Sequence, residues 1–233
     1  MNKKTFIEEL KKINIDITKE QLEKLDKFYN LLVDWNNKIN LTTITKEEDV
    51  YLKHFYDSLT LIKAIDLTKD LKICDVGSGA GFPGIVLKIV FPNLNITLID
   101  SLQKRVNYLN DIIKKLNLIN IKALHARMEE FSKENEEQFD IITARAVGNT
   151  KLLTEISIKS LKINGKLIFM KANLMNELDN TIYLFNNLGC ILKEVVKFKL
   201  PIEESNRSLV IIEKIKKTPS KYPRRLDKIK KSL

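Results

Sequence analysis

The segment Leu71–Phe91 (LKICDVGSGAGFPGIVLKIVF) constrains the fold more than any other part of the chain. Its first residues are mostly apolar and predict a short buried strand over Lys72–Val76. Four of the chain's seven glycines then fall within eight positions, at Gly77, Gly79, Gly81 and Gly84. From Ile85 the apolar residues recur at helical spacing. A strand, a glycine turn and a helix predict the first half of a nucleotide-binding βα unit, because glycine allows positive φ and close ligand approach.

From Leu71 onward, strand-like and helix-like segments alternate, which is typical of a parallel α/β sheet. Strands are predicted at 72–76, 95–100, 121–125, 139–144 and 166–170, and helices at 84–91, 104–116, 129–135, 149–161 and 175–188. Two long strand-like segments, 191–200 and 208–214, follow and are predicted to pair as antiparallel neighbours. Such an antiparallel end is less common in a plain dinucleotide-binding fold.

The first 68 residues predict a helical subdomain. Thr18 and Gln21 fit a capping box, and apolar residues then recur every three to four positions until the segment WNNKINLTTI. A further helix is predicted over Glu47–Ile65. We therefore expect a helical subdomain at 1–68, an α/β domain at 69–215 and a basic tail at 216–233.

Positive charge is concentrated at the C-terminus. The 233 residues carry a formal net charge of +10, and residues 214–233 hold nine Lys or Arg against Asp227 alone. A basic tail on a nearly neutral body indicates a polyanionic partner. Nucleic acid suits it better than a membrane because the tail has no apolar face. A solubilising, disordered end is the alternative.

Signals for membranes, export and metals are lacking in the sequence. No apolar segment approaches the length of a membrane span, and the first residues have no signal-peptide core, so we expect a cytoplasmic protein that does not bind membranes. Cys74 and Cys190 lack metal-site spacing and the chain has two His, so we expect free buried thiols and no metal.

Two nucleotide-binding patterns overlap in the glycine turn. GAGFPG, from Gly79 to Gly84, matches the dinucleotide fingerprint, with Asp100 about 20 residues further on. The pattern D-x-G-x-G-x-G, from Asp75 to Gly81, is associated with S-adenosylmethionine. The Asp75 carboxylate would repel a pyrophosphate at the helix N-terminus, whereas it suits the cationic methionine end of S-adenosylmethionine. Asp75 therefore favours S-adenosylmethionine over NAD, and Asp100 is expected to bind the ribose hydroxyls of either cofactor.

Six segments carry a family resemblance, in order: WNNKINLTTI, HFYDSL (His54–Leu59), DVGSGAGFPGI, LIDSLQKR (Leu98–Arg105), ARMEEF (Ala126–Phe131) and TARAV (Thr143–Val147). Together they resemble the ribosomal RNA small subunit methyltransferase G family, also called glucose-inhibited division protein B. The resemblance implies an α/β class I S-adenosylmethionine-dependent methyltransferase. Its Rossmann-like sheet would be mostly parallel with an antiparallel last strand, and a helical extension would precede it. It also implies N7 methylation of one guanine in 16S ribosomal RNA.

The resemblance places further residues at the cofactor. Gly77 and Phe82 match positions at the methionine and sulfonium end, and Met128 and Glu129 match the segment beside the adenine. The family usually has Ala where Met128 stands, which leaves a backbone contact intact but crowds the adenine. The predicted cofactor site comprises Asp75, Gly77, Gly79, Gly81, Phe82, Asp100, Met128, Glu129 and Arg145.

Arg145 matches a family arginine at the end of the fourth strand. Guanine N7 has a free lone pair at neutral pH, so its methylation needs orientation and desolvation but no general base. Arg145 is predicted to orient the substrate through guanine O6 or a phosphate, to hold the methionine carboxylate, or both. An ion pair with Glu129 or Asp75 is the structural alternative. His54 and Asp57, one helical turn apart, are expected to tether their helix near the cofactor cleft.

Further RNA contacts are predicted at the end of the fifth strand and in the tail. Lys171 is one candidate, with a solvated surface position as the alternative, and Tyr222, Arg224 and Arg225 are expected to contact phosphates. The family tail usually carries Gly and Pro, which Leu226–Lys231 lacks. The expected partner is 16S ribosomal RNA, a 30S subunit or its assembly intermediate, bound by a monomer. An NAD-dependent oxidoreductase and a non-catalytic ribosome-assembly factor are the alternatives.

Overall fold

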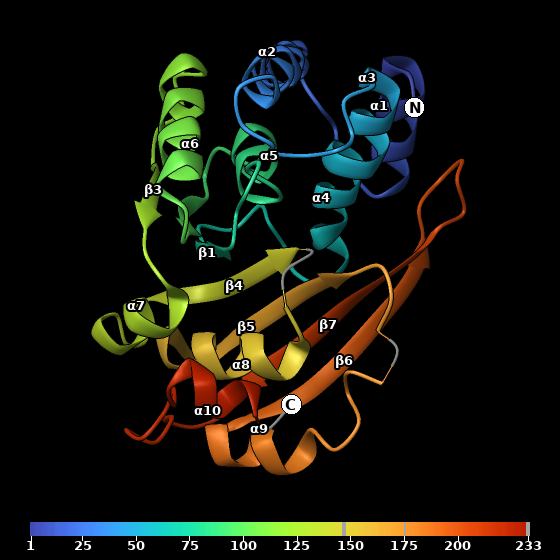
Figure 1. Ribbon diagram of the computed structural model, residues 1–233. Helices are drawn as coiled ribbons and strands as arrows, with labels where there is room; N and C mark the ends of the chain where they lie inside the picture. Colours follow the sequence, from blue (N-terminus) through green and yellow to red (C-terminus); the bar gives the residue numbers. More distant parts are fainter. Residues whose placement is uncertain (146–147, 175, 232–233) are drawn as a thin grey trace.

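A computed structural model describes residues 1–145, 148–174 and 176–231 as a seven-stranded sheet with helices on both faces (Figure 1). The strand order is β3-β2-β1-β4-β5-β7-β6. The strands are β1 Lys72–Val76, β2 Asn95–Asp100, β3 Ile121–His125, β4 Phe139–Arg145, β5 Leu161–Lys171, β6 Cys190–Lys199 and β7 Asn206–Lys214. Neighbours pair in parallel except at β7, which runs antiparallel to both β5 and β6. The predicted Rossmann-like sheet with an antiparallel last strand is confirmed.

Two groups of helices cover opposite faces of the sheet (Figure 1). The first group is α1 Lys3–Lys12, α2 Lys19–Asn36, α3 Glu47–Val50, α4 Asp57–Leu59, α5 Gly84–Val90 and α6 Gln103–Lys115. The second is α7 Met128–Glu134, α8 Thr150–Ser157, α9 Ile182–Leu188 and α10 Leu226–Lys230. Each group shares its own apolar core, with Phe28 and Leu98 in the first and Phe169 and Phe185 in the second. The N-terminal helices thus pack on the same core as α5 and α6.

The register brings the ends of the central strands to one edge. Asp75 of β1 pairs with Leu98 of β2 and Thr143 of β4, so these three parallel strands end together. The strand order reverses between β1 and β4. In open α/β sheets, ligands bind beyond the carboxyl ends of the strands at such a reversal.

The N-terminal helices are joined to the sheet layer by polar contacts. The predicted capping box is present, because Thr18 Oγ1 accepts from the Gln21 N–H and the Gln21 side chain accepts from the Thr18 N–H. Gln21 also donates to the Val90 carbonyl at 2.9 Å. At the other end of α2, Trp35 donates to the Asp111 carboxylate of α6 at 2.7 Å. These contacts fix α2 across α5 and α6.

The predicted helix over Glu47–Ile65 is helical but not uniform. α3 continues as a π-helical turn over Tyr51–Tyr56, then as α4, and then as a 3₁₀ turn over Thr60–Lys63. Such π-helical insertions are rare and occur frequently at functional sites. This one carries Lys53 and His54, which both contact the end of β4.

The predictions between 149 and 188 need correction. The predicted helix at 149–161 ends earlier, and β5 is longer than predicted because Leu161 already pairs with Phe139. The predicted helix at 175–188 begins with Met175, which lies outside the described residues, and only Ile182–Leu188 is helical. The Glu177 carboxylate accepts hydrogen bonds from the N–H and the hydroxyl of Thr150. These bonds link the segment around Glu177 to the start of α8.

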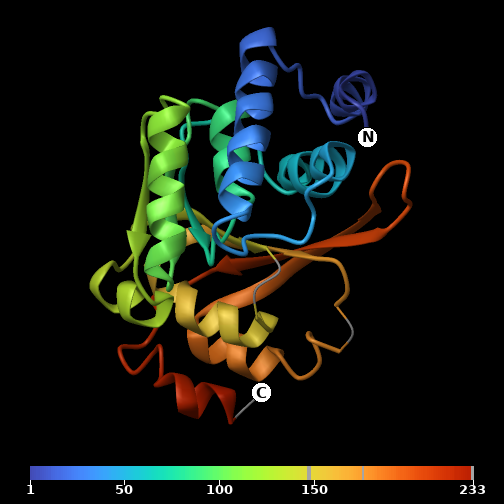
Figure 2. The ribbon, with the colours of Figure 1, turned by 45° about the horizontal axis from the view of Figure 1, so that its top comes forward.

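The basic tail folds back onto the second helical layer, where α10 lies beside α8 and α9 (Figure 2). Tyr222 and Ile229 are 7% and 1% exposed and belong to the second core. Thr218 donates to the Leu188 carbonyl at 2.9 Å. The described part of the tail, residues 216–231, is therefore part of the folded body, unlike the disordered end that was the alternative.

Candidate active site

The glycine turn lies between β1 and α5, at the reversal of strand order. Gly79 and Gly81 have φ values of 54° and 91°, in the left-handed region that glycine adopts without strain. The N–H groups of Gly77 and Ser78 donate to the Ile99 carbonyl at 2.8 and 3.1 Å. These bonds tie the turn to the end of β2.

Asp75 is a fully buried carboxylate directly before the turn. Its Oδ2 accepts from the Gly84 N–H at 3.0 Å, whereas its Oδ1 has no hydrogen-bond partner among the described residues. Burial raises the pKa of Asp75 to about 7. A buried polar atom without a partner is rare and costly. The unpartnered oxygen makes Asp75 a candidate contact for a cationic ligand group.

Asp100, 2% exposed at the end of β2, organises the other side of the turn. Its Oδ2 accepts from the Gly79 N–H and its Oδ1 from the Leu102 N–H, both at 2.9 Å. Arg105 Nη1 lies 3.6 Å from Oδ2. Each carboxylate oxygen keeps a second lone pair, so these bonds leave Asp100 able to accept from ribose hydroxyls.

The residues at this edge fit S-adenosylmethionine. The unpartnered Asp75 Oδ1 suits the methionine ammonium, and Asp100 suits the ribose. Met128 begins α7 with its side chain buried in the second core, which leaves its backbone for an adenine contact. Glu129 is half-buried, with Oε1 3.8 Å from Arg127 Nη1. The individual cofactor contacts of these residues stay predictions.

Phe82, in the turn, is the centre of a ring cluster. The His54 imidazole stacks on it with centroids 4.4 Å apart and an interplanar angle of 22°. The Arg145 guanidinium carbon lies 4.9 Å from the same centroid. Phe28 of α2 lies 5.4 Å from it. The turn is thereby joined to the N-terminal helices and to the end of β4.

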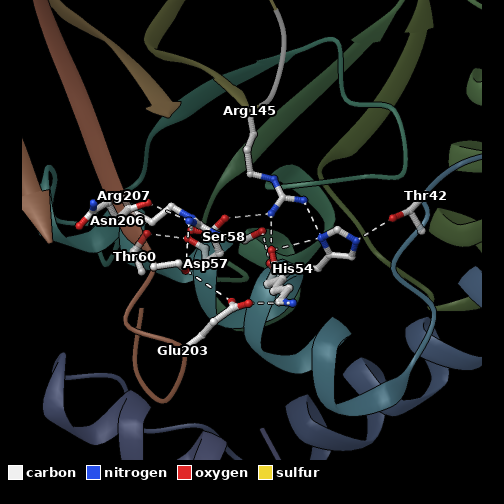
Figure 3. Close-up of polar contacts among 11 residues, drawn as sticks. Thr42, His54, Asp57, Ser58, Thr60, Arg145, Glu203, Asn206 and Arg207 are labelled. Atoms are coloured by element: carbon white, nitrogen blue, oxygen red, sulfur yellow. Dashed lines mark hydrogen bonds and ion pairs between the residues drawn. The ribbon is translucent and has the colours of Figure 1, made fainter. Parts of the chain in front are cut away.

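Arg145 is held by the π-helical turn and α4. Figure 3 shows its guanidinium between His54 on one side and Asp57 on the other. Nη1 donates to the Lys53 carbonyl at 2.8 Å and to Asp57 Oδ2 at 3.2 Å, and Nη2 lies 3.0 Å from His54 Nδ1. The predicted tether of His54 and Asp57 near the cleft therefore exists, and its attachment point is Arg145. Asp57 is the observed ion-pair partner, in place of the Glu129 or Asp75 considered above.

A cavity of about 440 Å³ opens beside Arg145, toward β5 and β7. Its titratable lining residues are Lys53, His54, Asp57, Arg145, Lys171, Glu177 and Arg207. Asp57 Oδ1 accepts from Arg207 Nε at 3.2 Å, so one carboxylate joins β4 and β7 (Figure 3). The cavity is thus lined by more basic side chains than carboxylates, and Arg145 connects it to Phe82 of the glycine turn.

The structure brings Lys171 to this cavity but places the tail residues elsewhere. Lys171 is 8% exposed, with Nζ 2.9 Å from Glu177 Oε2 and 2.7 Å from the Gly148 carbonyl, so it does not occupy the solvated surface position considered above. Arg224 forms a two-pronged ion pair with the fully buried Glu155, at 2.8 and 2.6 Å. Arg225 is exposed, and Tyr222 is buried. Direct RNA contact by these four residues stays a prediction.

Sequence reasoning missed Arg207 and Thr42. Arg207 is the second residue of the apolar strand β7. A lone arginine at the start of a buried strand is a weak signal that the sequence did carry. Thr42 lies in the WNNKINLTTI segment, and its Oγ1 is 3.0 Å from His54 Nε2. Both residues join the site only through contacts between distant segments. Part of the TARAV motif, Ala146 and Val147, lies outside the described residues.

Solved structures with the same architecture include a precorrin-6y C5,15-methyltransferase from Geobacter metallireducens, with TM-score 0.52 and 16% identity over 77% of this chain and 95% of that one. A SAM-dependent methyltransferase from Aquifex aeolicus has TM-score 0.51 and 18% identity over 78% and 98%. At these identities the likeness shows the fold alone. The strand order, the glycine turn and the acidic strand ends define a class I S-adenosylmethionine-dependent methyltransferase.

Sequence comparison is more specific than the fold. Residues 21–210 match the family described as rRNA small subunit methyltransferase G. Relatives named ribosomal RNA small subunit methyltransferase G, from Lysinibacillus sphaericus and Bacillus thuringiensis, are each 46% identical over 97% of this chain, covering 96% and 95% of their own lengths. The chain belongs to the rRNA small subunit methyltransferase G family, and it is a methyltransferase that uses S-adenosylmethionine.

Two further findings concern the described residues as a whole. None of their helices is long and apolar enough to cross a membrane. They also contain no cluster of three or more His, Cys, Asp or Glu side chains that could hold a metal ion.

Proposed function

We propose that the chain methylates N7 of a specific guanine in 16S ribosomal RNA. S-adenosylmethionine, when bound, supplies an electrophilic methyl group on its sulfonium. The observation that favours N7 concerns the side chains lining the cavity beside Arg145 that could accept a proton, namely Asp57, Glu177 and His54.

Each of these groups is already engaged with a cation. Asp57 accepts from Arg145 and Arg207. Glu177 accepts from Lys171 and also from Thr150. His54 presents Nδ1 to Arg145. Methylation of an exocyclic amine requires removal of a proton, whereas guanine N7 carries none. In this cavity each described proton acceptor already has a cationic partner, which suits methylation at N7, where no proton has to be removed.

Arg145 is proposed as the group that orients the substrate. A guanidinium only donates hydrogen bonds, and the usual paired contact of Arg with guanine uses both O6 and N7. Because N7 must stay free to react, O6 or a phosphate is the partner that we propose. The Arg145 guanidinium carbon lies 4.9 Å from the centroid of the Phe82 ring. This contact keeps the second predicted role open, in which Arg145 holds the methionine carboxylate.

The remaining predicted features belong to the same proposal. Lys171 and Arg207 add positive charge to the cavity, which suits an RNA phosphate. The exposed Arg225 and neighbouring tail lysines extend the contact. The substrate is 16S ribosomal RNA, free or in a 30S subunit or assembly intermediate, and the enzyme acts as a cytoplasmic monomer. The proposed division is 1–68, 69–215 and 216–233.

Transfer of labelled methyl groups tests this function. Tritiated S-adenosylmethionine is incubated with the protein and 30S particles that lack the modification, and the labelled nucleotide is identified. Label on guanine N7 is expected, and label on an exocyclic nitrogen would refute the assignment. Arg145→Ala is expected to lower turnover far more than Lys228→Ala, an exposed lysine of α10.

Melting temperatures of the same protein with each cofactor distinguish the proposed function from an NAD-dependent oxidoreductase. S-adenosylmethionine is expected to raise the melting temperature, whereas NAD is not, because the Asp75 carboxylate at the start of α5 would repel a pyrophosphate. A larger shift with NAD would favour an oxidoreductase. Binding of S-adenosylmethionine without methyl transfer to any RNA would favour a non-catalytic assembly factor.

A further inference from the structure

His54 is a buried imidazole with both ring nitrogens in polar contact. It is 8% exposed and lies against the Phe82 ring. Its Nδ1 is 3.0 Å from Arg145 Nη2 and 3.2 Å from the Lys53 carbonyl, and its Nε2 is 3.0 Å from Thr42 Oγ1. Which nitrogen carries the proton decides what this side chain can do.

The neighbours of Nδ1 assign that proton. A guanidinium can only donate, so Nδ1 must be the acceptor toward Arg145. The Lys53 carbonyl does not need a proton from His54, because Arg145 Nη1 already donates to it at 2.8 Å. The ring proton therefore belongs on Nε2, from which it is donated to Thr42 Oγ1.

The charges around the ring favour this neutral form. Burial and the positive charge of Arg145 lower the pKa of His54 to about 3. The charged groups facing the ring are Lys53 from its own turn and Arg145 from β4, and Asp57 and Arg207 lie beyond Arg145. An imidazolium at this position would oppose the guanidinium at 3.0 Å.

Thr42 is itself fixed by its own segment. Its N–H donates to Asn36 Oδ1 at 3.0 Å, at the end of α2. Its Oγ1 also accepts from the Ile44 N–H at 3.1 Å. The hydroxyl oxygen therefore faces His54 from a loop anchored on α2, and Figure 3 shows Thr42, His54 and Arg145 in one line of contacts.

We propose that Thr42 and His54 are positioning residues, in which a neutral His54 donates from Nε2 to Thr42 and accepts at Nδ1 from Arg145. The N-terminal helical segment thereby sets the orientation of the guanidinium. His54 and Asp57 contact different nitrogens of Arg145, because His54 accepts from Nη2 and Asp57 accepts from Nη1. Neither residue can therefore replace the other. The effect on catalysis rests on the proposed function, which makes Arg145 the group that orients the guanine.

Two substitutions of His54 separate positioning from packing. His54→Phe keeps the ring that stacks on Phe82 but removes both nitrogens. His54→Asn loses the ring but keeps a side-chain oxygen near the position of Nδ1. A positioning role predicts that the Asn variant retains the higher kcat, with S-adenosylmethionine affinity changed less than kcat in both. A packing role predicts the reverse order, which would overturn the proposal.

Thr42 gives a second pair that disturbs the fold less. Thr42→Val keeps the shape without the acceptor, and Thr42→Ser keeps the hydroxyl. We expect Val to lower kcat by about tenfold, because the guanidinium loses its fixed orientation, and Ser to stay within about twofold of the wild type. Equal kcat for the two variants, at equal melting temperature, would contradict the proposal.

A spectroscopic measurement keeps the proposal testable without methyl transfer. The chain has two histidines, so ¹H–¹⁵N spectra of ¹⁵N-histidine protein give two imidazoles, and His54→Asn identifies the signal of His54. The expected spectrum has a proton on Nε2 and none on Nδ1. A proton on Nδ1, or on both nitrogens at neutral pH, would overturn the proposal. Methyl transfer to another atom would instead refute the proposed function and leave this result standing.

Discussion

The carboxylate of Asp57 accepts a hydrogen bond from Nη1 of Arg145 at 3.2 Å, although 88 positions separate the two residues. Its other oxygen accepts from Nε of Arg207 at 3.2 Å, across 150 positions. Asp57 is 6% exposed, so these charges interact with little screening by water. One short helix thus joins β4 to β7 at the active site.

Asp57→Asn is expected to lower the free energy of unfolding by about 3 kcal/mol, because two guanidinium groups lose their shared anion in a buried place. The rate of methyl transfer should also fall at least tenfold, since Arg145 Nη1 loses its ion pair with the Asp57 carboxylate. Asp49→Asn is the matched control. Asp49 pairs with Lys53 one turn earlier at 41% side-chain exposure, and it should cost under about 1 kcal/mol. Urea unfolding measures both, and equal losses would refute a special role for Asp57.

Asp75 is expected to make cofactor affinity depend on pH. The methionine ammonium favours the ionised carboxylate, whose pKa of about 7 without ligand leaves it largely protonated at pH 6. The affinity for S-adenosylmethionine should therefore rise about tenfold between about pH 6 and about pH 8, with proton release on binding. Calorimetry in two buffers measures both. Asp75→Asn should bind more weakly and lose the proton release.

The contribution of Asp75 to the free energy of unfolding is expected to fall as pH rises, whereas its contribution to cofactor affinity is expected to increase. Folding raises the pKa of Asp75, so the folded state holds this proton more tightly than the unfolded chain. Its contribution to the free energy of unfolding is present below about pH 4 and is lost as pH rises through about 7. In the absence of cofactor, the difference in unfolding free energy between Asp75→Asn and the wild type should grow over this interval in favour of the variant. A constant difference would show that Asp75 does not titrate there.

The ion pair between Arg224 and Glu155 is expected to anchor the tail. Arg224→Ala leaves the fully buried Glu155 without its cation, which should lower the free energy of unfolding by about 3–5 kcal/mol. Arg225→Ala, one position further on, is the control. Its side chain is 80% exposed and pairs with Asp227, so it should change stability by less than about 1 kcal/mol. Thermal and urea unfolding would contradict the anchor if the two variants behaved alike.

The exposed lysines of the tail are expected to contribute salt-dependent RNA binding. Alanine at Lys228, Lys230 and Lys231 should reduce the slope of log K against log salt by about 2, if each contacts one phosphate. These substitutions leave the buried Tyr222 and Ile229 in place, unlike removal of the whole tail. Alanine at Lys4, Lys11 and Lys12 of α1 changes the same charge on another helix. An equal reduction there would show that total charge matters and the tail does not.

Local sequence patterns were sufficient for the order of elements and for the cofactor edge. The strands at 72–76, 95–100 and 121–125 have the predicted bounds, because buried parallel strands are short apolar segments bounded by turn residues. The capping box at Thr18 is likewise a local arrangement of four residues. Asp75 and Asp100 could be placed together because the carboxyl ends of parallel strands meet at one edge of a sheet.

The sequence by itself therefore determined the sheet, the glycine turn and the pair of carboxylates around it, since each depends on neighbours within a few positions. Only the tertiary structure decided what surrounds Arg145. Thr42, Asp57 and Arg207 come from three distant segments, and no local periodicity relates them. In the tertiary structure, Glu177 lies outside the helix that was predicted for it, and Arg224 pairs with Glu155. The physical reason is the same at each place: a buried charge requires a partner, and the packed chain, not the spacing of residues, decides which partner is within reach.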